Sequence, residues 1–167
     1  MLPYGTTPAI GSAAPASETP TATTPEGIAA ISTDQAPDPA FYQLSIAQAV
    51  ASGKPSWIIF STPAFCTTAT CGPTLDIVKG VAPEYADRVN FVHVEPYQLQ
   101  QTDTGLQPLL DANGQLQPVQ AVVDYGLPTE PYQFVVDGNG IVRAAFQGIA
   151  SADEIRAALD SVLAPAG

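Results

Sequence analysis

A strand, a loop and a helix follow one another within residues 57–81, and this junction constrains the fold more than any other feature. Residues 57–60 (Trp-Ile-Ile-Phe) form a continuous apolar run, which is typical of a central strand buried on both faces. Pro73 suits the first turn of a helix, in which Leu75 and Val78 recur at helical spacing. A buried strand that leads into a helix predicts a sheet covered by helices.

Three further strands follow from local patterns. Residues 89–94 alternate between apolar and polar side chains and predict a strand parallel to the first. Residues 132–137 and 141–147 predict two strands joined through Gly-Asn-Gly at residues 138–140, a strong hairpin signal. The second half of the chain therefore adds an antiparallel pair to a parallel sheet.

Helices are predicted from their end signals. Capping boxes at residues 45–48 and 151–154 each indicate where a helix begins. Residues 119–125 predict another short helix, which Gly126 ends. Residues 96–116 are rich in glutamine, and we expect an irregular insertion there, at the sheet edge where ligands of α/β folds bind.

From residue 41 onward the predicted order is a short strand, helix, strand, helix, strand, helix, two strands and a final helix. Alternation in the first half requires parallel strands with right-handed crossovers. We therefore expect an α/β fold with a central mixed sheet of four to five strands flanked by helices. Residues 41–167 are long enough to form this single domain.

Residues 1–40 differ from the rest in composition. Thr, Ala, Pro and Ser dominate, and the first basic residue is Lys54. Such a segment buries little apolar surface, so we expect a linker or a loosely packed arm, like a tether between a membrane anchor and a domain outside the cytoplasm. Residues 1–3 show no signal-peptide pattern, and we expect that Met1 begins a shortened chain whose export signal or anchor has been removed.

The chain is strongly acidic. Five Lys and Arg stand against 16 Asp and Glu in 167 residues, which gives a net charge of -11. Such a surface repels nucleic-acid phosphates and anionic lipid head groups, so neither kind of partner is expected. No run of 18 apolar residues is present, and we expect a monomer that meets a membrane only through a removed anchor or signal.

Cys66 and Cys71 are the only two cysteines, and they lie between the first predicted strand and the helix that follows it. A thiol near the positive end of a helix dipole has a lowered pKa and is a better nucleophile. Closing so short a loop with a disulfide would stabilise the fold by only roughly 2 kcal/mol. A pair with so little structural value is better explained by chemistry.

The order of elements, with a cysteine pair after the first central strand, resembles the thioredoxin fold over residues 41–165. Residues 71–74 (Cys-Gly-Pro-Thr) look like the start of the Cys-Gly-Pro-Cys site of that family. Residues 126–137 resemble the segment that carries the family's cis-proline. Residues 137–142 and the later Gly148 resemble the hairpin of extracytoplasmic, TlpA-like members.

The resemblance implies a thiol–disulfide oxidoreductase that acts on protein cysteines outside the cytoplasm and needs no cofactor. Family sites have two residues between the cysteines, whereas this chain has four, and two alignments remain open. In one, Cys66 is the nucleophile and Cys71 resolves the mixed disulfide. In the other, Cys71 is the nucleophile and Thr74 replaces the second cysteine. We favour Cys66 as the exposed thiol, and the direction of electron flow stays open.

The resemblance also implies a cis-proline that packs over the cysteines. We prefer Pro131 to Pro128, because a strand that began at Pro128 would contain Pro131 and lose a hydrogen-bond donor. The residue before this proline pairs with substrate in the family, which puts Glu130 beside the sulfurs, where a carboxylate would raise the pKa of a thiol. Phe65, just before Cys66, is expected either to contact substrate or to pack beneath the site.

Two other functions fit parts of this pattern. A non-catalytic binding module would keep the fold and hold Cys66 and Cys71 in a structural disulfide. A copper carrier would add a histidine to the two cysteines. His93 is the only histidine, however, and it falls in a predicted strand, not in the later loop where that branch keeps its ligand. We expect His93 to be structural or solvent-facing, and we expect no metal site.

Overall fold

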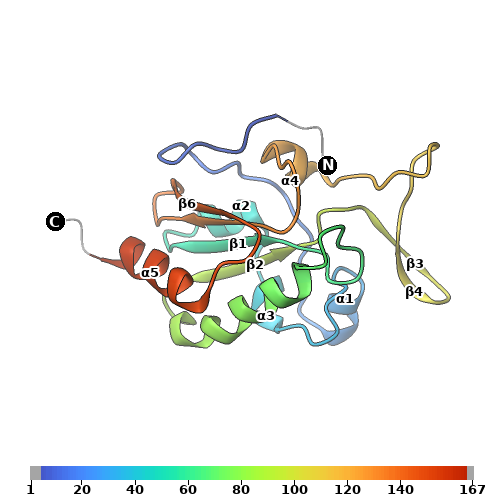
Figure 1. Cartoon of the computed structure of the whole chain (residues 1–167). Helices are drawn as coiled ribbons and strands as arrows, with labels where there is room; N and C mark the ends of the chain where they lie inside the picture. The colour runs from blue at the N-terminus through green and yellow to red at the C-terminus, as the bar shows by residue number, and fades with distance from the viewer. Residues whose placement is uncertain (1–4, 165–167) are drawn as a thin grey trace.

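The computed structural model describes residues 5–164, and a four-stranded mixed sheet forms its centre (Figure 1). The strands are β1 (Ser56–Phe60), β2 (Asn90–Val94), β5 (Tyr132–Val136) and β6 (Val142–Gln147). Their order across the sheet is β2-β1-β5-β6. β1 pairs in parallel with β2 and antiparallel with β5, and β6 runs antiparallel to β5. The expected α/β fold around a mixed sheet is confirmed.

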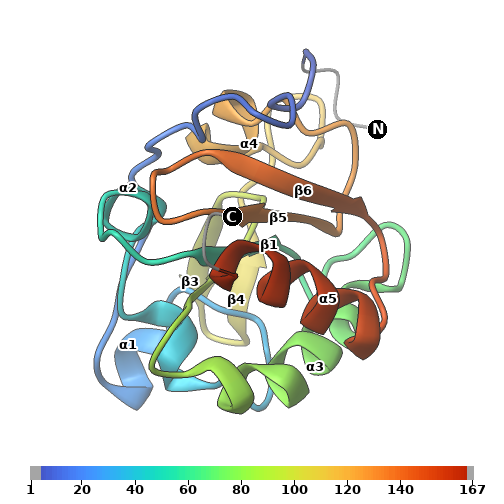
Figure 2. The same cartoon turned by 90° about the vertical axis from the view of Figure 1, so that its left-hand side faces the viewer.

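Helices cover both faces of this sheet (Figures 1 and 2). They are α1 (Pro25–Ala29), α2 (Ile46–Val50), α3 (Cys71–Val81), α4 (Gln120–Asp124) and α5 (Ala152–Leu163), with two short 3-10 helices, η1 (Pro39–Tyr42) and η2 (Ala82–Tyr85). The long helices α3 and α5 pack on one face, and the short helices α2 and α4 pack on the other. Both cysteines therefore lie where β1 leads into the first long helix.

The central strand β1 divides its side chains between two hydrophobic cores. Trp57 and Ile59 join the core under α3 and α5. Ile58 and Phe60 join the core under α2 and α4. All four side chains are fully buried, which confirms the prediction of a strand buried on both faces. Because both faces are packed, the end of β1 is a rigid base for the loop that follows it.

The local end signals predict the helix starts correctly. Ser45 accepts a hydrogen bond from the backbone of Gln48, and Ser151 does the same for Glu154. In each case the side chain of the second residue accepts from the backbone of the serine in return. Both capping boxes are therefore complete, and the predictions of α2 and α5 are confirmed.

Two regions differ from the predictions. The short strand expected before α2 is wrong: η1 forms there instead, because Pro39 suits a first helical turn and the Asp38 carboxylate accepts from the Ala40 amide. The insertion is not irregular throughout, since it contains the hairpin of β3 (Leu99–Thr102) and β4 (Gly105–Pro108). These two strands pair with each other and not with the central sheet, and neither strand buries one face fully. Their sequences therefore lack the alternation of apolar and polar residues from which a strand is predicted.

The N-terminal segment is extended, but it is packed tightly rather than loosely. Ala13 pairs with Ile141 beside β6, so the segment runs along the sheet's hairpin. Ala14 belongs to one hydrophobic core and Ile28, which is 2% exposed, belongs to the other. Residues 1–3, on which the expectation of a shortened chain rests, lie outside the described residues. The domain boundary at residue 40 stays a prediction.

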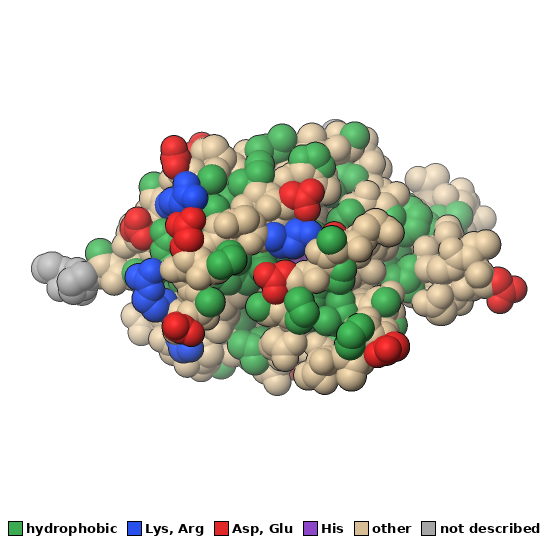
Figure 3. Space-filling model, turned by 90° about the horizontal axis from the view of Figure 1, so that it is seen from below, with side chains coloured by type: hydrophobic (Ala, Val, Ile, Leu, Met, Phe, Trp, Pro, Cys, Tyr) green, Lys and Arg blue, Asp and Glu red, His purple; other side chains and the backbone are tan. Residues whose placement is uncertain are grey.

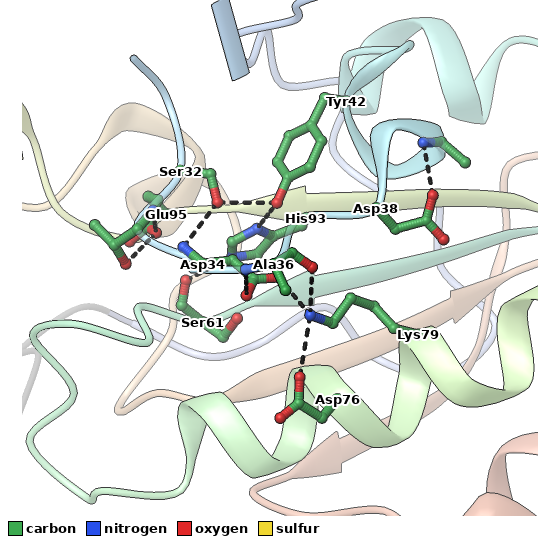
Figure 4. Close-up of polar contacts among 12 residues, drawn as sticks. Ser32, Asp34, Ala36, Asp38, Tyr42, Ser61, Asp76, Lys79, His93 and Glu95 are labelled. Carbon is green, nitrogen blue, oxygen red and sulfur yellow. Dashed lines mark hydrogen bonds and ion pairs between the residues drawn. The ribbon is translucent and has the colours of Figure 1, made fainter. Parts of the chain in front are cut away.

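A buried chain of hydrogen bonds ties this segment to the sheet (Figure 4). His93, 5% exposed on β2, places Nε2 2.8 Å from the Ser61 carbonyl and Nδ1 2.9 Å from the Tyr42 hydroxyl. Because a carbonyl only accepts, Nε2 carries a proton, and in the tautomer protonated there Nδ1 accepts from Tyr42. Burial raises the pKa of Tyr42, so its hydroxyl keeps the proton that it donates. The Ser32 hydroxyl lies 2.9 Å from that of Tyr42 and completes the chain.

Positive charge on the surface is sparse, and three of the five basic residues, Lys79, Arg143 and Arg156, form ion pairs. Figure 3 shows each basic group on the face seen from below lying beside acidic groups. Lys79 pairs with Asp34 and Asp76 (Figure 4), and Arg156 pairs with Glu84 and Asp153. Within residues 5–164, no helix has both the length and the apolar character needed to cross a bilayer.

Replacing Tyr42 by Phe should lower the free energy of unfolding by about 1–3 kcal/mol, because Nδ1 of His93 is then buried without a donor. Urea denaturation measures this loss. Tyr132→Phe is the matched control: its hydroxyl has no hydrogen-bond partner among the described residues, so the loss should stay below about 0.5 kcal/mol. Equal losses in the two variants would contradict a stabilising role for the buried hydrogen bonds.

Candidate functional site

Cys66 and Cys71 form a disulfide whose Cα atoms lie 5.9 Å apart. That separation falls inside the usual range for disulfides, so a spacer of four residues closes without displacing the backbone. Cys71 is the first residue of α3 and is fully buried, whereas Cys66 lies in the loop and is partly exposed. The two sulfurs of one bond therefore differ in their access to a partner molecule.

No side chain in the cap or first turn neutralises the partial positive charge at the start of α3, where Cys71 lies. Thr70 occupies the N-cap position but makes no capping hydrogen bond with its side chain. The first turn of α3 also contains no acidic residue. The partial positive charge of the helix start is therefore unmasked beside Cys71, where it would stabilise a thiolate.

Glu130 holds the loop between the cysteines. Its side chain is 2% exposed, and Oε1 accepts hydrogen bonds from the Thr67 amide at 3.0 Å and the Thr67 hydroxyl at 2.6 Å. Oε2 accepts from the Tyr97 hydroxyl at 2.6 Å. Burial, and then the hydrogen bond to Glu130, raise the pKa of Tyr97, which keeps its proton as a donor. The three donors satisfy a buried carboxylate that no basic residue contacts within residues 5–164.

The spacer also carries hydroxyl groups close to the exposed sulfur. The Thr68 hydroxyl oxygen lies 3.2 Å from Cys66 Sγ, 2.9 Å from the Thr70 hydroxyl and 3.1 Å from the Glu130 carbonyl oxygen. Ala69 has a φ of +61°, a backbone conformation that residues other than glycine rarely adopt. The spacer is therefore an ordered turn with its own polar contacts.

The remaining expected site residues lie around this loop. The Glu130–Pro131 peptide bond is cis, and Pro131 is the proline that we preferred to Pro128 from the sequence. Pro131 is buried, and its carbonyl accepts from the Gly148 amide at 2.9 Å. Phe65 is half-buried directly before Cys66. The structure thus places Glu130 beside the cysteine loop, as the resemblance implies. Its carboxylate is buried and binds Thr67 and Tyr97.

The N-terminal segment reaches the base of the same loop. The Thr33 hydroxyl accepts from the Ala64 amide at 3.1 Å and donates to the Glu95 carboxylate at 2.6 Å. The Thr33 amide donates to the same carboxylate oxygen at 2.6 Å. Four buried polar atoms have no hydrogen-bond partner among residues 5–164: Ser61 Oγ, Thr62 Oγ1, Thr74 Oγ1 and Glu95 Oε2. Sequence patterns missed Thr33, Thr67 and Tyr97, because none of them belongs to a motif.

The geometry gives no support to a copper site. Both ring nitrogens of His93 are engaged, one with Tyr42 and the other with Ser61. Among residues 5–164, no group of three or more His, Cys, Asp or Glu side chains is arranged to hold a metal ion. His93 is buried and structural.

A mixed sheet in this order, with a disulfide at the start of the helix after the central strand and a cis-proline beside the loop, is the arrangement of a thioredoxin-like fold. The fold named by the resemblance is confirmed. No protein-family model matches the sequence, and no curated protein sequence matches it significantly.

Solved structures place the chain among thioredoxin-fold proteins. A proposed thiol:disulfide interchange protein DsbE from Chlorobium tepidum is 16% identical over 94% of this chain and 99% of its own, with a TM-score of 0.60. A thioredoxin-family thiol:disulfide interchange protein from Chlorobium tepidum TLS is 17% identical over 89% of this chain and 98% of its own, with a TM-score of 0.52. MTB dsbF, in mixed oxidized and reduced forms, is 23% identical over 70% of this chain and 85% of its own, with a TM-score of 0.50. At these identities the likeness shows the fold.

Replacing Glu130 by Ala should expose the Thr67 amide to exchange and lower the free energy of unfolding by about 2–4 kcal/mol, because three donors lose their acceptor. Hydrogen exchange at Thr67, followed by NMR, reports on the loop itself. Glu130→Gln is the matched control: it keeps an acceptor for Thr67, and the Tyr97 hydroxyl can turn to accept from the amide. Unchanged protection of Thr67 in the Ala variant would show that Glu130 does not hold the loop.

Proposed function

We propose that this protein exchanges its Cys66–Cys71 disulfide with cysteines of other proteins, through a mixed disulfide on Cys66. The observation that carries the proposal is the unequal exposure of the two sulfurs: Cys66 is partly exposed, whereas Cys71 is buried at the start of α3. A partner can reach only the outer sulfur, and the inner one is placed where a helix start favours it as a thiolate leaving group.

In the oxidising direction, a partner thiolate attacks Cys66 Sγ. A bond forms between the partner and Cys66 as the Cys66–Cys71 bond breaks, and the electron pair leaves on Cys71 as a thiolate. A second partner thiolate then attacks the partner sulfur of the mixed disulfide, which forms the partner's disulfide and releases the Cys66 thiolate. The partner loses two electrons and the protein gains them. The reverse sequence reduces a partner disulfide.

The substrates in this proposal are protein thiols and disulfides, and Phe65, Glu130 and Pro131 border the place where they would bind. Phe65 would offer its exposed part as an apolar contact beside Cys66. We also propose that the protein acts as a monomer outside the cytoplasm, in a compartment oxidising enough to keep disulfides. Two proteins of similar fold from Chlorobium tepidum are described as thiol:disulfide interchange proteins, which supports the same activity.

Trapping tests the role of each cysteine. With glutathione disulfide as the probe, the reduced Cys71→Ser variant should form a lasting mixed disulfide on Cys66, because the resolving thiol is gone. The reduced Cys66→Ser variant keeps only the buried thiol and should react at least about tenfold more slowly. Mass spectrometry counts the adducts. Faster reaction of Cys66→Ser would transfer the nucleophile to Cys71, and no adduct in either variant would refute exchange.

The reduction potential separates exchange from a structural disulfide. Equilibration of the wild-type protein with a glutathione redox buffer should give a value between about -120 and -270 mV, the range of exchange proteins. Alkylation and mass spectrometry measure the reduced fraction. A value below about -300 mV, without exchange against small thiols, would instead support the non-catalytic binding module.

A further inference from the structure

The Thr68 hydroxyl has three polar neighbours and a single proton. Its oxygen lies 3.2 Å from Cys66 Sγ, 3.1 Å from the Glu130 carbonyl oxygen and 2.9 Å from the Thr70 hydroxyl oxygen. A hydroxyl donates one hydrogen bond and accepts up to two. Thr70 can supply one bond by donating to Thr68, so Thr68 must divide its own proton between the Glu130 carbonyl and the Cys66 sulfur.

The oxidation state of Cys66 decides that choice. A disulfide sulfur is neutral and a weak acceptor, so in the oxidised protein the Thr68 proton goes to the Glu130 carbonyl. A thiolate carries a full charge, and hydrogen bonds to charged acceptors are about twice as strong as those between neutral groups. When the Cys66 thiolate forms, the proton can turn to the sulfur by rotation of the hydroxyl alone, with no movement of heavier atoms.

The spacer has contacts that do not depend on the disulfide. Glu130 accepts two hydrogen bonds from Thr67, the neighbour of both Cys66 and Thr68. At the other end, the Thr74 amide donates to the Thr70 carbonyl at 2.9 Å and fixes the first turn of α3. None of these bonds involves a sulfur, so we expect the hydroxyl to stay beside Cys66 when the disulfide is reduced.

We propose that Thr68 is a catalytic residue of the exchange reaction, which donates a hydrogen bond to the Cys66 thiolate and returns it to the Glu130 carbonyl when the disulfide re-forms. The reaction itself rests on the proposed function, but the hydrogen bond is a property of the reduced protein alone. It favours the Cys66 thiolate on a loop that contains no basic residue.

The test compares Thr68→Val, which removes the hydroxyl at nearly constant shape, with Thr68→Ser, which keeps it. Both are made in the Cys71→Ser background, so that Cys66 is the only thiol, and iodoacetamide alkylation is followed against pH. Thr68→Val should raise the pKa of Cys66 and slow alkylation at neutral pH by about tenfold, since a thiolate loses a charged hydrogen bond. Thr68→Ser should restore most of the rate.

Protection of the Thr67 amide shows whether the loop keeps its place in each variant. If Thr68→Val changes this protection, Thr68→Ala is compared with Thr68→Ser, a pair that also differs by the hydroxyl. A Cys66 titration that is identical with and without the hydroxyl would overturn the inference, whatever trapping shows. A shifted titration together with no mixed disulfide would instead refute the proposed exchange and leave the hydrogen bond established.

Discussion

The buried carboxylate of Glu130 is the interaction on which the site depends. A carboxylate with 2% exposure, and with no basic neighbour in the part of the chain that the structure describes, is costly unless donors surround it. Thr67 supplies two donors and Tyr97 a third. These bonds join the cysteine loop, the start of the insertion and the residue before Pro131. The carboxylate thus fixes a spacer that is two residues longer than the usual one, which would otherwise have few constraints.

The same carboxylate binds the loop that carries Cys66, and around the two sulfurs the structure provides neutral dipoles rather than basic side chains. At Cys71 the unmasked start of α3 supplies partial positive charge. At Cys66 the Thr68 hydroxyl lies within hydrogen-bonding distance. Lys79, the basic residue on α3, is committed to Asp34 and Asp76. In so acidic a chain, these fixed dipoles are the groups that would favour a thiolate at the proposed site.

Local sequence patterns predicted much of the fold, because β1, the capping boxes and the β5–β6 hairpin are determined by neighbours in the chain. The N-terminal segment was the main failure, since its burial comes from partners such as Glu95, 62 residues from Thr33. The site shows the same division. The position of Glu130 beside the loop followed from the resemblance, but Tyr97 and Thr67, 33 and 63 residues away, belong to no motif.

The length of the spacer follows from what it holds. With two residues between the cysteines there is no room for a residue that binds Glu130, a residue that faces the sulfur and a turn back to the helix. Four residues provide all of these: Thr67 binds the carboxylate, Thr68 contacts Cys66, Ala69 makes the turn with positive φ, and Thr70 precedes α3. The long spacer and the buried carboxylate therefore depend on each other, since Thr67 in the spacer supplies two of the donors that the carboxylate requires.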